Sequence, residues 1–233
     1  MDKVVDSIDA ALEGVSDGAV LMSGGFGLCG NPENLIAGLH RKGIKGLTII
    51  SNNCGTTDKG LGILLMARQV RKMVSSYVGE NKEFERQYLG GELEVELNPQ
   101  GTLAERIRAG AFGIGGFYTP TGVGTKIAEG KETRTIDGRE YVLERPLKAD
   151  FALIRAWKAD RWGNLVFRKT ARNFSPLMCM AAKCTIVEAE HIVDVGQLDP
   201  DQIHVPSIFV HRIVQGRDHQ KWIEQRTVRP RPQ

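Results

Sequence analysis

The sequence has 233 residues, 41% of them hydrophobic and 25% charged, which is an ordinary composition for a soluble globular protein. No apolar run approaches the roughly 20 residues that span a bilayer, and the N-terminus alternates acids with aliphatics, so we expect a cytoplasmic protein without a membrane span or targeting segment. The net charge of +3 comes from residues 212–233, which hold six Lys/Arg and two Asp/Glu, but no nucleic-acid module or basic stripe accompanies them, so we expect no nucleic-acid binding.

The elements of the first half alternate between helix and strand. Apolar periodicity predicts strands at residues 19–23, 46–51 and 72–78, and helices at 4–15, 33–43, 60–70, 82–90 and 102–110. Residues 92–97 (ELEVEL) alternate too strictly for a strand that is buried on both faces. Segments alternating at this spacing favour an α/β fold, with a mostly parallel sheet and helices on both faces.

The second half departs from this pattern before the sheet resumes. In residues 131–147 the pair Asp137-Gly138 stands between β-rich stretches, which predicts a small β-hairpin excursion. Further strands are predicted at 150–157, 184–190 and 207–214, and a short apolar helix at 175–182. Because the chain has no repeat or long linker, we expect residues 1–233 to form a single domain with a basic tail at 217–233.

Neither the cysteines nor the histidines form a recognisable site pattern. A chain of this length needs no disulfide scaffold, so we expect reduced thiols at Cys29, Cys54, Cys179 and Cys184. The histidines lack the H-x-x-x-H spacing of helical metal ligands, so we expect no metal site; they are His40, His191, His204, His211 and His219.

The most distinctive stretch is GGFGLCG at residues 24–30, which contains a G-x-G-x-x-G pattern. In a dinucleotide-binding turn the helix begins near the second glycine, and an acid about 20 residues further on binds the ribose. Here Pro32 and Glu33 start the helix after the third glycine, and Asn52-Asn53 stand where that acid would be. The context argues against nicotinamide binding and indicates a ligand-facing loop whose backbone N–H groups can bind an anion.

Several stretches together resemble one family. DGAVLMSGGFGLCGNPENLI at residues 17–36 is similar to the N-terminal signature of the family I coenzyme A transferases, apart from Ser23 in the aliphatic triplet. SNNCG at 51–55 and the longer stretches 74–110, 117–125 and 151–174 look like the A half of members that move coenzyme A from succinyl-CoA to acetoacetate. The resemblance thins only at 131–140 and in the tail, and it implies a CoA-transferase-like α/β fold made of an A and a B half.

The mechanism that the resemblance implies requires a residue that this chain lacks. In the family a glutamate of the B half, in an S-E-N-G stretch, attacks the acyl thioester and passes through an anhydride to a glutamyl-CoA thioester. This chain has Ser51-Asn52-Asn53-Cys54-Gly55, and an amide cannot do that chemistry. We therefore expect no activity from this chain alone and a separate B-type subunit, in a heterodimer or heterotetramer, with coenzyme A as substrate and no permanently bound cofactor.

The same resemblance implies supporting roles for this chain. Asn52 and Gln100 are expected to donate hydrogen bonds to oxygens that become negative during transfer, and the cofactor-binding loop is expected to comprise Gly24, Gly25, Phe26, Gly27, Leu28, Cys29 and Gly30. A polar turn residue remains the alternative for Asn52 and a helix N-terminal residue for Gln100.

Other interpretations of the sequence also stay open. Solvated or paired charges are expected at Arg106 and Arg108, with substrate carboxylate binding as the alternative. Trp157 and Trp162 are expected either to pack at a subunit interface or to cover the sheet. Alternatives for the whole protein are the A-type subunit of a 3-oxoadipate or acetate CoA-transferase, and a non-catalytic acyl-CoA-binding protein.

Overall fold

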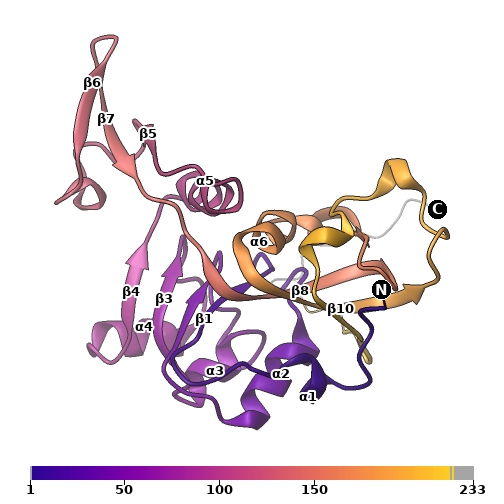
Figure 1. The fold of residues 1–233 in the computed structure, drawn as a ribbon. Helices are drawn as coiled ribbons and strands as arrows, with labels where there is room; N and C mark the ends of the chain where they lie inside the picture. Colours follow the sequence, from indigo (N-terminus) through magenta and orange to yellow (C-terminus); the bar gives the residue numbers. More distant parts are fainter. Residues whose placement is uncertain (1, 221, 223–233) are drawn as a thin grey trace, which may run out of the picture.

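The protein is described by a computed structural model that covers residues 2–220 and 222, so most of the predicted basic tail at 217–233 lies outside the described residues. Within these residues, eight strands form one sheet in the order β11-β10-β8-β1-β2-β3-β4, with the short β9 beside β8 (Figure 1). Neighbours along this order pair in parallel, and β9 pairs antiparallel with β8. The strands are β1 Val20–Ser23, β2 Leu47–Ile50, β3 Val70–Ser75, β4 Glu94–Leu97, β8 Ala149–Asp160, β9 Leu165–Val166, β10 Ala182–Val193 and β11 Arg212–Gln215.

Helices cover both faces of this sheet, which confirms the predicted fold class. The central strand β2 is buried on both sides, and its successive residues enter different cores: Ile49 packs with α1 to α4, whereas Ile50 packs with α5 and α6. Figure 1 shows α1, α2 and α3 on one side of the sheet and α5 and α6 on the other. The helices are α1 Ile8–Ala11, α2 Glu33–Lys42, α3 Gly62–Met66, α4 Lys82–Leu89, α5 Gln100–Ala111 and α6 Ser175–Ala181.

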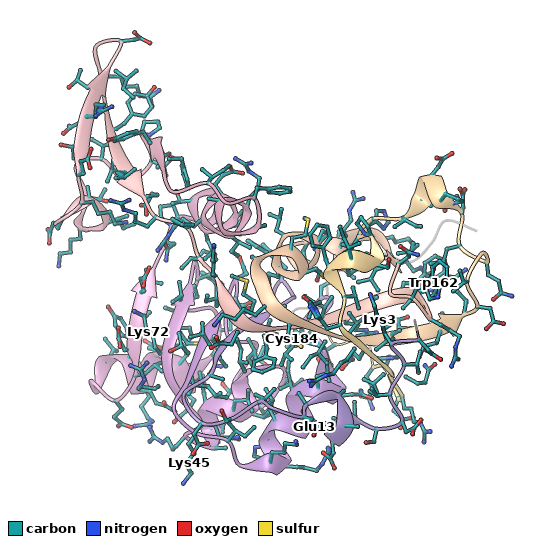
Figure 2. All side chains as sticks on the ribbon, in the orientation of Figure 1. Lys3, Glu13, Lys45, Lys72, Trp162 and Cys184 are labelled. Atoms are coloured by element: carbon teal, nitrogen blue, oxygen red, sulfur yellow. The ribbon has the colours of Figure 1, made fainter. Side chains whose placement is uncertain are left out.

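Local signals explain where α2 begins and ends. Pro32 precedes its first residue, Glu33, and Gly43 ends the helix in the left-handed conformation with φ 66°. On the edge of the sheet, β4 is partly exposed, as its strict alternation predicted. Lys72, labelled in Figure 2, extends from β3 to this edge, where its ammonium group lies 2.8 Å from Glu94 and 3.1 Å from Glu96.

A second, three-stranded antiparallel sheet projects away from the main body (Figure 1). It consists of β5 Phe117–Thr119, β6 Thr133–Ile136 and β7 Arg139–Glu144. Asp137 and Gly138 join β6 to β7 with φ values of 49° and 75°, the two positive angles that a two-residue hairpin requires. The excursion thus contains the predicted hairpin and, in addition, β5.

Four predicted elements differ clearly from the structure. The strand predicted at 72–78 spans Val70–Ser75. The helix predicted at 4–15 is limited to α1, because Ser7 caps it and the N–H of Val5 pairs instead with the carbonyl of Ile213, 2.8 Å away. The helix predicted at 60–70 ends at Met66, since Val70 already belongs to β3. The strand predicted at 207–214 begins only at Arg212, because Ser207–Phe209 forms a 3-10 turn directly after Pro206, which has no N–H to pair.

We expect opposite effects from two glycine substitutions within α5. A Cβ at Gly110 would lie 1.8 Å from the backbone oxygen of Leu147, so Gly110→Ala should lower the free energy of unfolding by about 1–3 kcal/mol. Gly101 has no atom within 4 Å of such a Cβ, so Gly101→Ala should be neutral or stabilising by up to about 1 kcal/mol. Urea denaturation of both variants tests this, and equal effects would contradict the packing described for α5.

Candidate active site

The predicted site residues lie at the carboxyl ends of neighbouring parallel strands. Because β1, β2, β3 and β4 are adjacent and parallel, the segments that follow them gather at the same edge of the sheet. These segments are residues 24–30, 51–55, 76–81 and 98–100. In open α/β sheets ligands bind at this edge, so the sequence motifs stand where the fold places chemistry.

Asn52 is buried and hydrogen-bonded at this edge. Its side chain is buried, with 2% of the residue exposed. The side-chain oxygen Oδ1 accepts a hydrogen bond from the Ser76 hydroxyl at 2.9 Å and another from Nε2 of Gln100 at 3.1 Å. Its Nδ2 lies 3.5 Å from Oδ1 of Asn53, at the limit of a hydrogen bond. The Asn52 amide therefore has a well-engaged acceptor end and a weakly engaged donor end.

The structure brings Gln100 next to Asn52, a contact that the sequence did not predict. Gln100 is the first residue of α5 and is exposed, while its amide nitrogen is directed at Asn52. One donor of Gln100 is thus already used within the protein. Ser76, which makes the shorter bond to Asn52, was not identified from the sequence, because the strand predicted at 72–78 included it, whereas β3 ends at Ser75.

The glycine loop at 24–30 is a tight turn packed against other backbone. The N–H of Phe26 and the N–H of Cys29 each donate to the other residue's carbonyl oxygen, at 3.0 and 2.9 Å. Gly25, Gly27 and Gly30 have positive φ, and a Cβ at Gly25 would lie 1.8 Å from the Asn31 side chain. The glycines are therefore required by close approach and by backbone conformation.

Most backbone donors of this loop already have protein partners. Gly24 donates to the carbonyl of Leu153 at 3.0 Å, Gly25 to Oδ1 of Asn173 at 3.1 Å, and Gly27 to Oδ1 of Asn53 at 3.1 Å. These bonds occupy donors that the sequence suggested for binding an anion. What the loop presents outward is the ring of Phe26, 48% exposed, together with the exposed Cys29.

Asn173 holds this loop from the opposite side and was not singled out from the sequence. Its Oδ1 accepts from the N–H of Gly25, and its Nδ2 donates to the carbonyl of Cys29 at 3.0 Å. Its φ of 21° lies at the border of the left-handed region, which costs a non-glycine residue free energy. The loop geometry is therefore maintained by a side chain nearly 150 residues away in the sequence.

The N-terminus of α2, where a dinucleotide fold binds phosphate, is occupied by a carboxylate of the protein. Oε2 of Glu188, on β10, accepts the N–H of Leu35 at 2.9 Å, and the N–H of Asn34 also bonds to this carboxyl group. Its other oxygen is buried and has no hydrogen-bond partner within the described chain. A ligand phosphate has no donors left here, which agrees with the argument against nicotinamide binding.

Arg106 and Arg108 have protein partners. Arg106 is 8% exposed and donates to Glu96 at 2.6 Å and to the backbone oxygen of Arg145 at 2.7 Å, joining α5 to the base of the projecting sheet. Arg108 pairs with Glu105 at 2.8 Å. The expectation of a paired surface charge holds for Arg108, whereas Arg106 is paired but buried, so the surface position expected for it is wrong.

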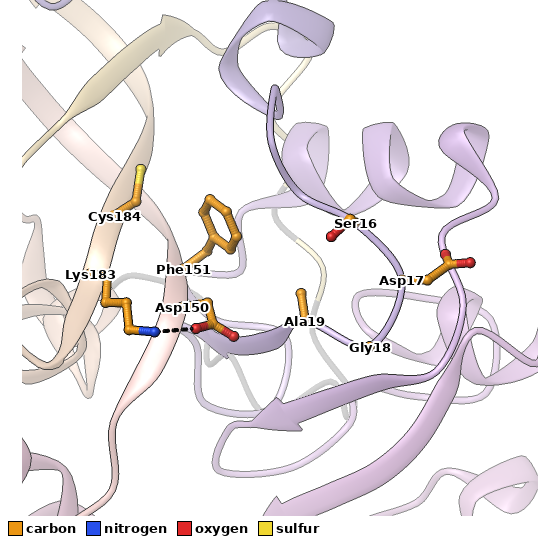
Figure 3. Close-up of a pocket in the computed structure, with 8 residues that line it drawn as sticks. All are labelled: Ser16, Asp17, Gly18, Ala19, Asp150, Phe151, Lys183 and Cys184. Atoms are coloured by element: carbon orange, nitrogen blue, oxygen red, sulfur yellow. Dashed lines mark hydrogen bonds and ion pairs between the residues drawn. The ribbon is translucent and has the colours of Figure 1, made fainter.

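The hollow and the cysteines do not form a site with the predicted residues. A hollow of about 420 Å³ lies at the amino ends of β1, β8 and β10, and none of the predicted site residues line it. Figure 3 shows its lining residues, among them Lys183, whose ammonium group lies 2.9 Å from Asp150. All four cysteines are free. The described part of the chain contains no cluster of ligands that could hold a metal, and no helix in it is long and apolar enough to cross a membrane.

Comparisons with known proteins agree with this arrangement. Residues 5–216 match the family described as Coenzyme A transferase. The chain is 61% identical over 228 residues to the A-type subunit of a probable succinyl-CoA:3-ketoacid coenzyme A transferase of Bacillus subtilis, covering 98% of this chain and 96% of that protein. It is 63% identical over 221 residues to the A-type subunit of the succinyl-CoA:3-ketoacid coenzyme A transferase of Xanthomonas campestris, covering 94% and 91%.

Solved structures show the same fold at low identity. An acyl-CoA transferase from E. coli O157:H7, solved as a thioester complex with CoA, matches with a TM-score of 0.82 and 20% identity. The match covers 94% of this chain, which spans 48% of that one. Glutaconate coenzyme A-transferase from Acidaminococcus fermentans matches with a TM-score of 0.80 and 20% identity, over 91% of this chain and 75% of that one.

Glu188 should make stability depend on pH. Burial raises its pKa from about 4.5 to about 8, opposed by its hydrogen bond from Leu35 and the charge of Arg155. The folded chain then holds a proton that the unfolded chain releases, so the free energy of unfolding falls as pH rises from about 4.5 to about 8, by at most about 1.4 kcal/mol per unit. In Glu188→Gln this dependence should be absent, and parallel denaturation profiles of the two proteins across that range would contradict it.

Proposed function

The chain belongs to the coenzyme A transferase family, and from this premise we propose that it is the A-type subunit of a heteromeric enzyme that moves coenzyme A from succinyl-CoA to acetoacetate. Its relatives of similar length carry the names of such subunits, and the match extends over nearly the whole chain. It is thus an enzyme subunit whose substrates are CoA thioesters. We further propose acetoacetate as the acceptor acid, a B-type subunit as the partner, and roles for single residues.

The observation that carries the proposal is the amide at position 52. Where the family resemblance places a reactive glutamate in the B half, this chain has Asn52, buried and held by Ser76 and Gln100. Its Nδ2 has a single long contact, 3.5 Å from Oδ1 of Asn53, and is the donor with which this amide could bind a substrate oxygen. We infer that a B-type partner supplies the glutamate and that this chain supplies donors for it.

The reaction then proceeds by alternating acyl transfers. The partner's glutamate attacks the thioester carbonyl of succinyl-CoA and releases the CoA thiolate, which attacks the resulting anhydride at the glutamyl carbonyl and releases succinate. The acetoacetate carboxylate attacks the glutamyl thioester and again frees the thiolate. The thiolate attacks the acetoacetyl carbonyl of the second anhydride, which gives acetoacetyl-CoA and restores the glutamate.

Each of these steps passes through a tetrahedral intermediate with a negative oxygen. An N–H donor positioned toward that oxygen lowers the barrier, and losing one typically costs about 10²–10³-fold in rate. We assign this role to Nδ2 of Asn52. A carboxylate at this position would instead repel the partner's glutamate and raise its pKa.

The loop at 24–30 is proposed to line the site of coenzyme A by its outward surface. Phe26 and, after β3, Tyr77 are large aromatic side chains that are 48% and 59% exposed in this chain. Both residues neighbour the asparagine pair through backbone contacts: Gly27, next to Phe26, bonds to Asn53, and the N–H of Tyr77 donates to the carbonyl of Asn52. Substrate or partner would cover these rings. The cytoplasmic location stays a prediction.

The division of the enzyme between two polypeptides can be tested by reconstitution. The purified chain should transfer no coenzyme A, because it lacks the reactive glutamate. Co-expression with a B-type subunit that contains S-E-N-G should give transfer with ping-pong kinetics, measured with succinyl-CoA and with acetoacetate, 3-oxoadipate or acetate as acceptor. Acetoacetate should be the best acceptor; transfer by the isolated chain would contradict the proposal.

Asn52→Ala should reduce kcat of the assembled enzyme by more than tenfold, because one donor to the negative oxygen is lost. The complex should still assemble, as measured by size-exclusion chromatography. Gln197→Ala, which changes an exposed amide in the turn after β10, is the control and should leave kcat unchanged. An unaltered kcat in Asn52→Ala would remove the role assigned to this residue.

A further inference from the structure

The hydroxyl group of Ser76 is hydrogen-bonded to Asn52 at the carboxyl edge of the sheet. Ser76 is the first residue after β3, and its Oγ lies 2.9 Å from Oδ1 of Asn52 and 3.2 Å from the Asn52 carbonyl oxygen. The shorter contact is to Oδ1. We propose that Ser76 is a positioning residue for the transfer reaction: it orients the Asn52 amide so that Nδ2, and not Oδ1, meets the developing oxyanion. This inference rests on the function proposed for Asn52.

The orientation of an amide is decided by what faces each of its ends. Oδ1 of Asn52 accepts from two donors, Ser76 Oγ and Gln100 Nε2. Rotating the amide by half a turn would direct Nδ2 at the amide nitrogen of Gln100, so two donors would face each other. It would also leave the Ser76 hydroxyl to accept from Nδ2 and to donate only to the Asn52 carbonyl at 3.2 Å, in place of its 2.9 Å bond to Oδ1. Because Asn52 is almost fully buried, an unsatisfied group there costs about 1–3 kcal/mol, and the two contacts together favour the orientation in which Oδ1 accepts.

Backbone hydrogen bonds place the Ser76 hydroxyl in a fixed position. The N–H groups of Ser76 and Tyr77 both donate to the carbonyl oxygen of Asn52, at 3.0 and 3.1 Å. The chain leaving β3 is thereby joined to the chain leaving β2. A group that positions a reacting side chain is effective when its own geometry is held in this way.

Of the two donors to Asn52, Ser76 is the one better suited to fix it. Gln100 is exposed and reaches Asn52 through a long side chain, which loses substantial rotational freedom in a single geometry. Ser76 is half-buried and has one side-chain rotation to lose. Removing its hydroxyl should therefore loosen Asn52 even when Gln100 is present.

The adjacent residue supplies a matched control. Ser75, the last residue of β3, is fully buried, and its hydroxyl has no hydrogen-bond partner within the described residues. Ser75→Ala and Ser76→Ala remove the same atom from neighbouring positions. Only the second removes a hydrogen bond to Asn52.

The kinetic test uses the complex with the B-type partner. Ser76→Ala should lower kcat about tenfold, because a displaced donor stabilises the oxyanion poorly, and should leave KM for both substrates within about twofold. Ser76→Thr keeps the hydroxyl and should restore most of kcat, and Ser75→Ala should match the unmodified enzyme. In an Asn52→Ala background, Ser76→Ala should have no further effect. An unchanged kcat in Ser76→Ala, or an undiminished effect in that background, would overturn the inference.

A structural measurement separates this inference from the proposed function. Neutron crystal structures of the complex, in which the amide nitrogen and oxygen are distinguished, should show one Asn52 side-chain orientation in the unmodified enzyme and more than one, or a shifted one, in Ser76→Ala. If Asn52 keeps its single orientation in Ser76→Ala, the inference is wrong. If the unmodified complex transfers no coenzyme A to any acceptor, the proposed function fails, while the crystallographic comparison still decides the role of Ser76.

Discussion

The hydrogen bonds made by Asn52 join the ends of three neighbouring strands, and the candidate site depends on them. Asn52 follows β2, Ser76 follows β3, and Gln100 begins the helix after β4. The Asn52 carbonyl and side-chain oxygens together accept from backbone and side-chain groups of the other two segments. Since the strands are parallel and adjacent, residues about 24 positions apart meet at one edge. The arrangement holds the uncharged amide of Asn52 at the edge where we propose that a partner's carboxylate reacts.

The glycine loop extends this edge to β1 and shows how one motif can have different uses. Its glycines allow close contact with Asn31 and with the segment around Asn173, and most of its N–H groups donate to protein acceptors. At the same time, Glu188 occupies the N-terminus of α2. The loop is therefore held by hydrogen bonds within the protein and exposes the ring of Phe26, whereas a phosphate-binding turn, which its pattern suggests, would leave its N–H groups free.

The sequence predicted the fold class and the location of most of the site, but not the contacts within it. Apolar periodicity and the signals at Pro32, Gly43 and Asp137-Gly138 identified α2 and the hairpin, because those signals are local. The strand expected at 207–214 starts late because Pro206 and tertiary pairing decide its beginning. Ser76 and Asn173 could not be identified, since their roles depend on partners 24 and almost 150 residues away. Asn52 was identified through the family resemblance, which compares it with a glutamate that this chain does not have.

We propose that the covalent chemistry takes place on a partner's carboxylate while this chain contributes oriented donors. Mass spectrometry of both polypeptides, after the complex has been incubated with succinyl-CoA without an acceptor, tests this division. A coenzyme A adduct is expected on a single glutamate of the B-type partner and none on this chain. A coenzyme A thioester on any glutamate of this chain would contradict it.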